Sequence, residues 1–487
     1  MLLRQTFLYL PAQLLPAAMQ FVALVLWSHL ATPSVIGIVT LFVSIQDFMV
    51  LGFVNFWTSY TVRYATKEFE TPEAATAFDR TATAVMIGSS LLQAAVAVGV
   101  YALLIDLHPR SWLLPILVLV VFGRAFNTFQ AERGRARGDI LLYSIETIAG
   151  PVGGALIGVL LLWRFGSDEL WIFAGYAIAQ TLAALAGLLR DRSWVRWGRP
   201  DRAVLRHALS YGGPLIASSL FIWITQNTPR VLVSAFFGLA AAGVYALGFG
   251  LGFRVAVIAA MSVTAAAFPI AVRYANKGDM PGAMRQLANN AVLLVAVLAA
   301  SIAGLALVSG DVIGLFVNAS LQEAARPIML WSLLAGAIIC FRQHFLHQVF
   351  LVKEHTRPLG YVAAAEAVAA VLIGLLIVPR WGALGGVISL TVTSTGSMAA
   401  VLVMAIGQGL RPPWRDFARI ALATGAMALA VLAIAGGHSV PLLLVRIAAG
   451  CTAFGGVMVL LYGRALAAMW RARRVAPVPE LVEEAGL

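Results

Sequence analysis

The sequence contains little charge and almost no cysteine, and both shortages narrow the class of protein. Only 11% of its 487 residues are Asp, Glu, Lys or Arg, while 61% are hydrophobic. A water-soluble domain is about a quarter charged and about half apolar, so this composition excludes an ordinary soluble fold. The two cysteines, Cys340 and Cys451, both fall within apolar segments, so we expect no structural disulfide.

Motifs for catalysis and nucleotide hydrolysis are also missing from the sequence. The chain has no glycine-rich phosphate loop ending in Lys-Ser or Lys-Thr, and no His-Glu-x-x-His metal motif. We therefore predict a protein that is not an enzyme and that uses no cofactor or metal. Any transport by this chain would draw on an ion gradient, the membrane potential or removal of the product.

Long apolar runs are what the chain has instead. Runs of about 20 residues recur along its whole length, and each is long enough to cross roughly 30 Å of hydrocarbon. The net charge of +12 lies mostly in the connecting segments, where positive residues mark the cytoplasmic side, so a nucleic-acid partner is not expected. With both termini cytoplasmic, few Lys or Arg residues fall on the outer side: Arg110, Arg164, Arg326 and Arg380.

Two distant stretches of the chain end in nearly the same letters, "VRYATK" from Val62 and "VRYANK" from Val272. Further matches keep the same order, since "LIGVLLLWRFG" aligns without gaps on "LIGLLIVPRWG". The same alignment pairs Gly37 with Gly243, Arg124 with Arg342, Gln130 with Gln348 and Tyr143 with Tyr361. Six spans are therefore repeated as six spans in the same orientation, which is the parallel-repeat arrangement of some transporters.

These observations predict an all-α, polytopic membrane fold with about 14 transmembrane helices. It would have two six-helix lobes in parallel repeat plus two extra C-terminal helices, with a substrate path between the lobes. The predicted segments are an N-terminal lobe (1–190), a cytoplasmic linker (191–208), a C-terminal lobe (209–408), two additional helices (409–470) and a cytoplasmic tail (471–487).

Three segments resemble one branch of a known transporter superfamily. They are "LATPSVIGIVTLFVSIQDFMVLGF", "LRHALSYGGPLIASSLFIWITQNTPRVLVSAFFGLAAAGVYALGFGL" and "IVPRWGALGGVISL". In this order they are similar to the polysaccharide-transporter (O-antigen or exopolysaccharide flippase-like) family of the multidrug/oligosaccharidyl-lipid/polysaccharide exporter superfamily. The resemblance covers about residues 1–410. One departure is the sequence Thr228-Pro229-Arg230, because the family often has an Asp before that Arg, so an Asp–Arg pair is not carried over.

The resemblance implies a flippase of the bacterial inner membrane. Its implied substrate is a polyprenyl-diphosphate-linked oligosaccharide, the repeat unit of O-antigen or exopolysaccharide. Membrane lipids would surround it, and a polysaccharide polymerase or export complex is a further partner to consider.

Arginines within the predicted spans are the first candidates for a binding site. A charge at the centre of a membrane costs roughly 2.5–3.5 kcal/mol on insertion scales, so such residues usually face a cavity. The planar guanidinium binds phosphate oxygens with two parallel hydrogen bonds and stays charged. We predict that Arg254 and Arg342 line the central cavity, joined by Arg230 and Arg124, and that Arg446 belongs to the added helices. The alternative for each arginine is a structural ion pair.

Carboxylates and histidines within the spans are candidates for gating or coupling. Asp47 aligns with Phe253, beside Arg254, so the repeat suggests an Asp47–Arg254 pair across the lobes, either a gate or a static pair. Glu146 and Glu366 would couple ions or pair with arginines. His344 and His347 would line the polar cavity wall or form hydrogen bonds within the bundle, because too few further ligands are near them for a metal site.

Other functions stay open at this level. A peptidoglycan lipid-precursor flippase of the same superfamily would have the same helices. A multidrug/cation antiporter would favour an acidic cavity, against which the five intramembrane arginines argue. A membrane polysaccharide polymerase or acyltransferase would need a large polar outer loop, whereas the longest predicted one, about 310–325, offers only Asp311 and Glu323.

Overall fold

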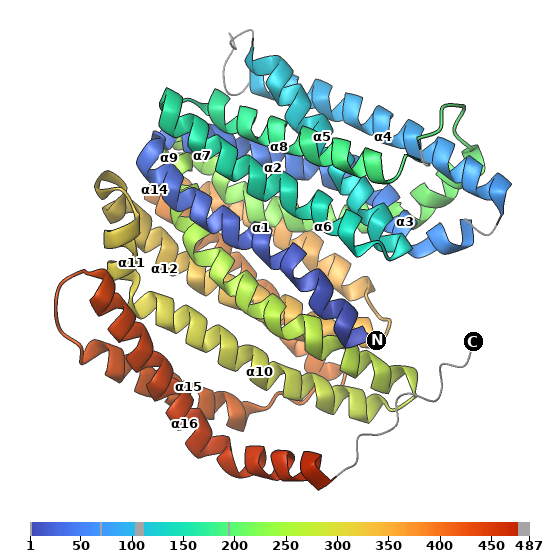
Figure 1. Ribbon diagram of the computed structural model, residues 1–487. Helices are drawn as coiled ribbons and strands as arrows, with labels where there is room; N and C mark the ends of the chain where they lie inside the picture. The colour runs from blue at the N-terminus through green and yellow to red at the C-terminus, as the bar shows by residue number, and fades with distance from the viewer. Residues whose placement is uncertain (1, 69–70, 103–111, 193–194, 476–487) are drawn as a thin grey trace.

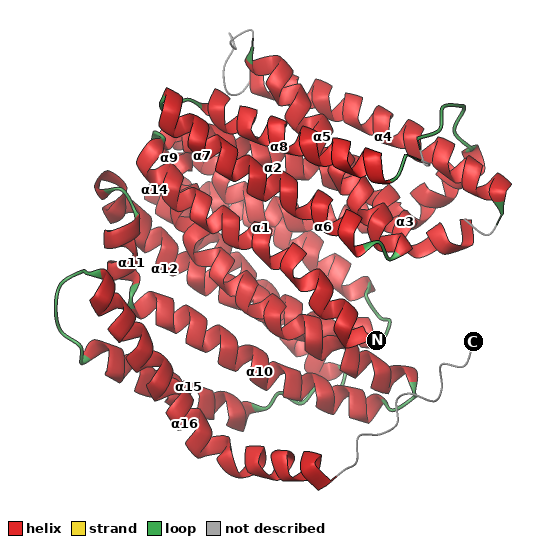
Figure 2. Ribbon diagram, viewed as in Figure 1, coloured by secondary structure: helices red, strands yellow, loops and turns green. Residues whose placement is uncertain are grey.

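The computed structural model describes residues 2–68, 71–102, 112–192 and 195–475 (Figure 1). Within these ranges all regular structure is helical (Figure 2). Ten of the described helices are long and apolar enough to cross a membrane, so the prediction of a multi-pass all-α protein is confirmed. Arg110 and most of the predicted tail 471–487 lie outside the described residues.

The segment predicted as the N-terminal lobe contains α1 (Leu2–Leu30), α2 (Pro33–Phe53), α3 (Asn55–Glu68), α4 (Pro72–Val100), α5 (Leu113–Arg137), α6 (Ile140–Ile148), the π-helical η2 (Ala149–Gly153), α7 (Gly154–Phe165) and α8 (Glu169–Arg190), and the name N-terminal lobe is kept for these helices. Local chemistry sets several of their starts. Thr32 and Thr71 cap α2 and α4 by accepting a backbone hydrogen bond, and each is followed by a proline in the first turn. This pairing satisfies a free N–H and pre-sets the helical φ angle.

The segment predicted as the C-terminal lobe, together with the end of the predicted linker, contains α9 (Arg202–Asn276), α10 (Met280–Leu307), α11 (Ser309–Phe316), α12 (Ala319–Phe341), the π-helical η3 (Arg342–Leu346), α13 (His347–Val352) and α14 (Arg357–Gly407), and the name C-terminal lobe is kept for these helices. The two additional helices are α15 (Trp414–Leu432) and α16 (Val440–Val475). They pack on each other, on α10 and on α11, at the edge of the molecule away from the N-terminal lobe (Figure 1).

Two of the long helices, α9 and α14, each consist of two helices joined at a glycine. Gly238 has φ 81° and ψ 178°, and Gly382 has φ 56° and ψ −138°. Residues with a Cβ rarely adopt these conformations. The chain reverses at Gly238, since Val233 before it and Tyr245 after it both lie against Gly386. The reversal brings both halves of α9 beside the N-terminal lobe.

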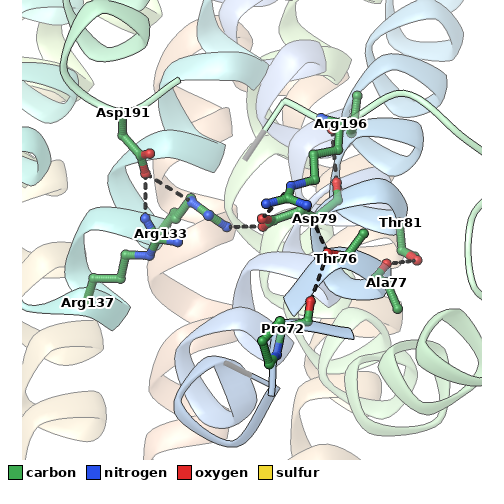
Figure 3. Close-up of polar contacts among 10 residues, drawn as sticks. Pro72, Thr76, Ala77, Asp79, Thr81, Arg133, Arg137, Asp191 and Arg196 are labelled. Atoms are coloured by element: carbon green, nitrogen blue, oxygen red, sulfur yellow. Dashed lines mark hydrogen bonds and ion pairs between the residues drawn. The ribbon is translucent and has the colours of Figure 1, made fainter. Parts of the chain in front are cut away.

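The linker between the lobes is held on the N-terminal lobe by buried charges (Figure 3). Arg133 of α5 is 1% exposed, and it lies 2.9 Å from the carboxylate of Asp79 and 3.3 Å from that of Asp191. Arg196 reaches Asp79 at 3.7 Å and donates a hydrogen bond to Thr76 at 2.8 Å. These contacts fix one side of the molecule, called the linker side here.

The lobes meet closely on the side opposite the linker. A Cβ on Gly37 of α2 would overlap the carbonyl oxygen of Leu239, and one on Gly243 would overlap that of Pro33. Nearby, Asn318 donates its backbone N–H to Ser28 at 3.4 Å. Gly37 and Gly243 are the pair that the internal repeat aligned, so equivalent points of the two lobes touch each other there.

Candidate functional site

A cavity of about 660 Å³ lies between the N-terminal lobe and α9. Its wall is built by α1, α2, α5, α6, η2, α8 and both halves of α9. Six charged residues line it: Asp47, Arg124, Glu132, Glu146, Arg230 and Arg254. Five of these are residues that the sequence analysis selected, and Glu132 is the one that it missed. The cavity therefore lies where intramembrane charges of the N-terminal lobe and of α9 converge.

Two of the cavity arginines have no carboxylate partner among the described residues. Arg230 donates to the carbonyl oxygen of Thr40 at 3.1 Å and to the hydroxyl of Ser44. Arg254 donates to the side-chain oxygen of Gln20. The Nε atoms of both guanidinium groups are buried and without a hydrogen-bond partner. Charges buried without a counter-charge are costly, so these two groups are suited to an anionic ligand.

The third cavity arginine, Arg124, is paired with Asp47. The two side chains form an ion pair, and Arg124 also donates to Gln46 at 3.3 Å. This corrects the predicted Asp47–Arg254 pair. The repeat alignment identified equivalent positions in the two lobes, but the partner is decided by which helix lies opposite. Arg254 reaches α1, whereas Arg124 of α5 reaches α2 within one lobe.

Glu146 forms part of the cavity wall and is 3% exposed. Its Oε1 accepts a hydrogen bond from Gln130 at 3.4 Å. Its Oε2 is buried without a hydrogen-bond partner. Unlike Asp47, Glu146 has no ion pair among the described residues.

Arg342, predicted to line the cavity with Arg254, lies elsewhere. It is buried inside the C-terminal lobe, where its Nη1 lies 2.5 Å from the carboxylate of Glu366 and also donates to Ser397. Ser394 and Ser397 donate to the same carboxylate at 3.2 and 3.0 Å. Arg342 and Glu366 therefore form an internal ion pair, which was the structural alternative for each of them, although the Nε of Arg342 is buried without a hydrogen-bond partner.

The two histidines follow Arg342 along the chain, at η3 and the start of α13, and neither is among the cavity residues. His344 shares a hydrogen bond with Thr264 at 3.0 Å. No group of three or more His, Cys, Asp or Glu side chains that would hold a metal occurs in the described part of the chain. His344 therefore has the alternative role considered for it, a hydrogen bond within the bundle, and neither histidine lies on the wall of this cavity.

Arg446 of α16 attaches the additional helices to the C-terminal lobe. It donates to both carboxylate oxygens of Asp311 on α11, at 2.7 and 2.6 Å, and His438 lies 2.7 Å from the same group. Burial acts to raise the pKa of Asp311, but the hydrogen bonds from His438 and Arg446 outweigh it and hold that pKa below its usual range. Sequence reasoning noted Asp311 only as a loop residue.

The arrangement of helices is that of a class of membrane transporters. The fold is similar to that of the Lipid II flippase MurJ in an inward closed conformation, with a TM-score of 0.74 and 12% identity, over 94% of this chain and 100% of that one. It is also similar to an inward-facing multidrug resistance MATE family transporter of the MOP superfamily, with a TM-score of 0.61 and 14% identity, over 81% and 94% of the two chains. A MOP superfamily transporter from Pyrococcus furiosus has a TM-score of 0.54 and 13% identity, over 84% and 95%.

The sequence itself identifies the family within that class. Residues 2–275 match the family model described as "Polysaccharide biosynthesis protein". The match covers more than half of the chain, so the chain belongs to this family, as the resemblance in its motifs predicted. Comparison with curated proteins finds no match.

Proposed function

We propose that this protein is a flippase that moves a polyprenyl-diphosphate-linked oligosaccharide across the bacterial inner membrane, through about fourteen transmembrane crossings. The main evidence for this proposal is that two cavity arginines, Arg230 and Arg254, have no carboxylate partner among the described residues. Membership of the polysaccharide biosynthesis family supports the sugar-bearing substrate.

The charge of the cavity suits a diphosphate. Arg124 is neutralised by Asp47, and Glu132 lies 3.5 Å from Arg135. Arg230 and Arg254 then supply two positive charges that are in no ion pair among the described residues, and the remaining charged residue of the cavity, Glu146, is bonded to neither of them. A diphosphate esterified at both ends keeps one ionised oxygen on each phosphorus, so its charge matches theirs. Guanidinium groups bind such oxygens with directed, charge-assisted hydrogen bonds.

Aromatic side chains give the same cavity a surface suited to sugars. Trp27, Phe173, Tyr176, Phe249 and Phe253 all line it. Sugar rings have apolar faces that pack on aromatic rings, while their hydroxyls bond to polar side chains. A head group with both phosphate and sugar would use both features, and its polyprenyl tail would stay in the surrounding lipid.

Alternating access would follow from the two lobes. In the proposed cycle, the close approach of the lobes at Gly37 and Gly243 is the closed gate on the side opposite the linker. Release on that side would require these two points to separate. We propose that the linker side is cytoplasmic, as the distribution of positive residues predicts, so that loading occurs there.

The first experiment is mass spectrometry of lipids from cells that lack this gene. Accumulation of one polyprenyl-diphosphate oligosaccharide, with loss of a surface polymer, would support the proposal and identify the sugar. Complementation with Arg230→Gln or Arg254→Gln should leave the lipid accumulated. The matched control is Arg285→Gln, which removes an exposed arginine of α10 that is not among the cavity residues and should restore export. Full export by both cavity variants would exclude the diphosphate site.

A second candidate is a peptidoglycan-precursor flippase, which the fold similarity to the Lipid II flippase MurJ favours. The same lipid extract separates the two, because the accumulated lipid would then carry a peptide-bearing head group. Sensitivity to cationic dyes without any accumulated lipid would instead indicate a drug antiporter.

A further inference from the structure

The sequence predicts three carboxylates for gating or coupling, and these three differ in whether the structure gives them an ion-pair partner. Asp47 is paired with Arg124, and Glu366 is paired with Arg342. Glu146 alone of the three has no cationic partner among the described residues, although it is as buried as Glu366. Its two oxygens have one hydrogen bond between them, from the neutral amide of Gln130 at 3.4 Å.

The surroundings of Glu146 contain charges, but these are bound to other groups. The elements packed on α6 are α1, α5, α8 and η2. Their charged or titratable groups with described side chains are His29 of α1, Arg124, Glu132, Arg133, Arg135 and Arg137 of α5, and Glu169, Tyr176 and Arg190 of α8, together with Tyr143 of α6 itself. None of them forms an ion pair or hydrogen bond with Glu146. Arg133 and Arg190, for example, are bonded to Asp191 and Asp139.

The absence of a side chain at Gly187 leaves room for the carboxyl group of Glu146. A Cβ on Gly187 of α8 would overlap Oε1 of Glu146 and lie 2.6 Å from Nε2 of Gln130. The π-helical turn η2 begins three residues after Glu146, and such turns inside membrane helices are frequent at functional sites. This carboxyl group has a pocket that only glycine at position 187 leaves open, and one of its oxygens has no hydrogen-bond partner. It also lies on the cavity wall. These three features are suited to binding a small ligand.

We propose that Glu146 is a proton-binding site, occupied in this conformation and emptied when the cavity fills with water. An ionised carboxylate buried without a partner is costly enough that the group is neutralised instead. On hydration the carboxylic acid transfers its proton to water, giving a carboxylate and a hydronium ion. If the site faces the two sides of the membrane in turn, one proton moves per cycle. This deepens the proposed function by naming a source of energy for it.

The test is chemical labelling of the full-length protein in detergent with N,N′-dicyclohexylcarbodiimide. In apolar surroundings a protonated carboxylic acid adds its O–H across a C=N bond of this apolar reagent. The O-acylisourea that forms rearranges to a stable N-acylurea, which is located by peptide mass spectrometry. Near neutral pH we expect Glu146 to be labelled at least about tenfold more than Glu366, because both oxygens of Glu366 are bound by Arg342 and two serines whereas Oε2 of Glu146 has no partner. The Glu146 adduct should decline as the pH rises, and Glu146→Gln should abolish it. Equal labelling of the two residues, or none at Glu146, would overturn the proposal.

A pair of glycine variants tests the pocket itself. Gly187→Ala should displace the carboxyl group and reduce the Glu146 adduct several-fold. Gly88→Ala in α4 meets no other atom within 4 Å, so it should leave the adduct unchanged. Retained labelling in Gly187→Ala would show that this pocket does not hold the proton. The assay needs no substrate, so its failure would leave the proposed flippase activity standing.

Discussion

The two lobes carry aligned arginines that lie in opposite kinds of environment. In the N-terminal lobe, the side chains of Arg124 and its partner Asp47 are 31% and 42% exposed and line the cavity. In the C-terminal lobe, those of Arg342 and its partner Glu366 are 6% and 5% exposed, and two serines donate hydrogen bonds to the Glu366 carboxylate. Arg124 and Arg342 are aligned by the repeat, yet Arg124 lines the cavity whereas Arg342 forms a buried ion pair within the C-terminal lobe.

Removing Arg342 should have the largest effect on stability. Arg342→Met leaves Glu366 as a buried charge without a partner, and breaking such a pair costs about 3–5 kcal/mol. Thermal unfolding of the purified protein measures this loss. The double variant Arg342→Met/Glu366→Met should recover much of it, because a buried pair replaced by apolar residues is often neutral. A double variant as unstable as the single one would show that Arg342 acts through something other than Glu366.

Asp311 and Arg446 form a second buried pair, which attaches the additional helices. Because the folded-state pKa of Asp311 is lowered, its contribution to stability is present above the ordinary Asp pKa of about 3.9. That contribution is lost as the pH falls through the lower folded-state pKa. Asp311→Asn should cost about 1–3 kcal/mol at neutral pH by leaving Arg446 with a neutral partner.

The matching measurement is thermal unfolding across pH. The wild-type advantage over Asp311→Asn should shrink between pH 5 and the acid limit. A constant difference between the two proteins over that range would mean that the carboxylate charge is not what holds α16 on α11.

Gly37 and Gly243 occupy equivalent positions in the two lobes and lie at the contact between them. Gly37→Val would place a side chain against the backbone of Leu239, and crowding of this kind costs about 1–3 kcal/mol. We expect the closed state to lose population, so that a cysteine at Val43 in the cavity reacts about tenfold faster with a membrane-impermeant thiol reagent added on the side opposite the linker.

The background protein for that assay has Cys340 and Cys451 replaced. Gly52→Val is the matched control on the same helix, because a Cβ there meets no atom within 4 Å. Equal reaction rates for the two variants would contradict a closure at Gly37.

Most of the charged residues that line the cavity could be predicted from the sequence, whereas their ion-pair partners could not. Arg124, Arg230, Arg254, Asp47 and Glu146 were selected because charges inside spans usually face a cavity, and all five line it. Their partners could not be predicted, since an ion pair depends on how each helix is rotated against its neighbour.

Arg342 and Arg133 are both buried away from the cavity, and only Arg342 was among the candidates predicted from the sequence. Arg342 also lies in a span, but Glu366 and Ser397, far along the chain, enclose it. Arg133 stands in "ERGRARGD", which is typical of an exposed basic turn. The structure instead extends α5 to Arg137 and buries Arg133 against Asp79 and Asp191.

Arg124→Gln should have the smallest effect on stability and the clearest effect on function. The pair with Asp47 is partly exposed, and such pairs contribute about 0–1 kcal/mol, so thermal unfolding should change little. Export should fall, because the released Asp47 would place a free negative charge beside Arg230 and Arg254 and weaken their attraction for a diphosphate. Asp47→Asn/Arg124→Gln removes both charges and should restore part of the export, measured by surface polymer in complemented cells. If Arg124→Gln instead unfolds the protein as Arg342→Met does, the aligned arginines share one structural role and the contrast between the lobes fails.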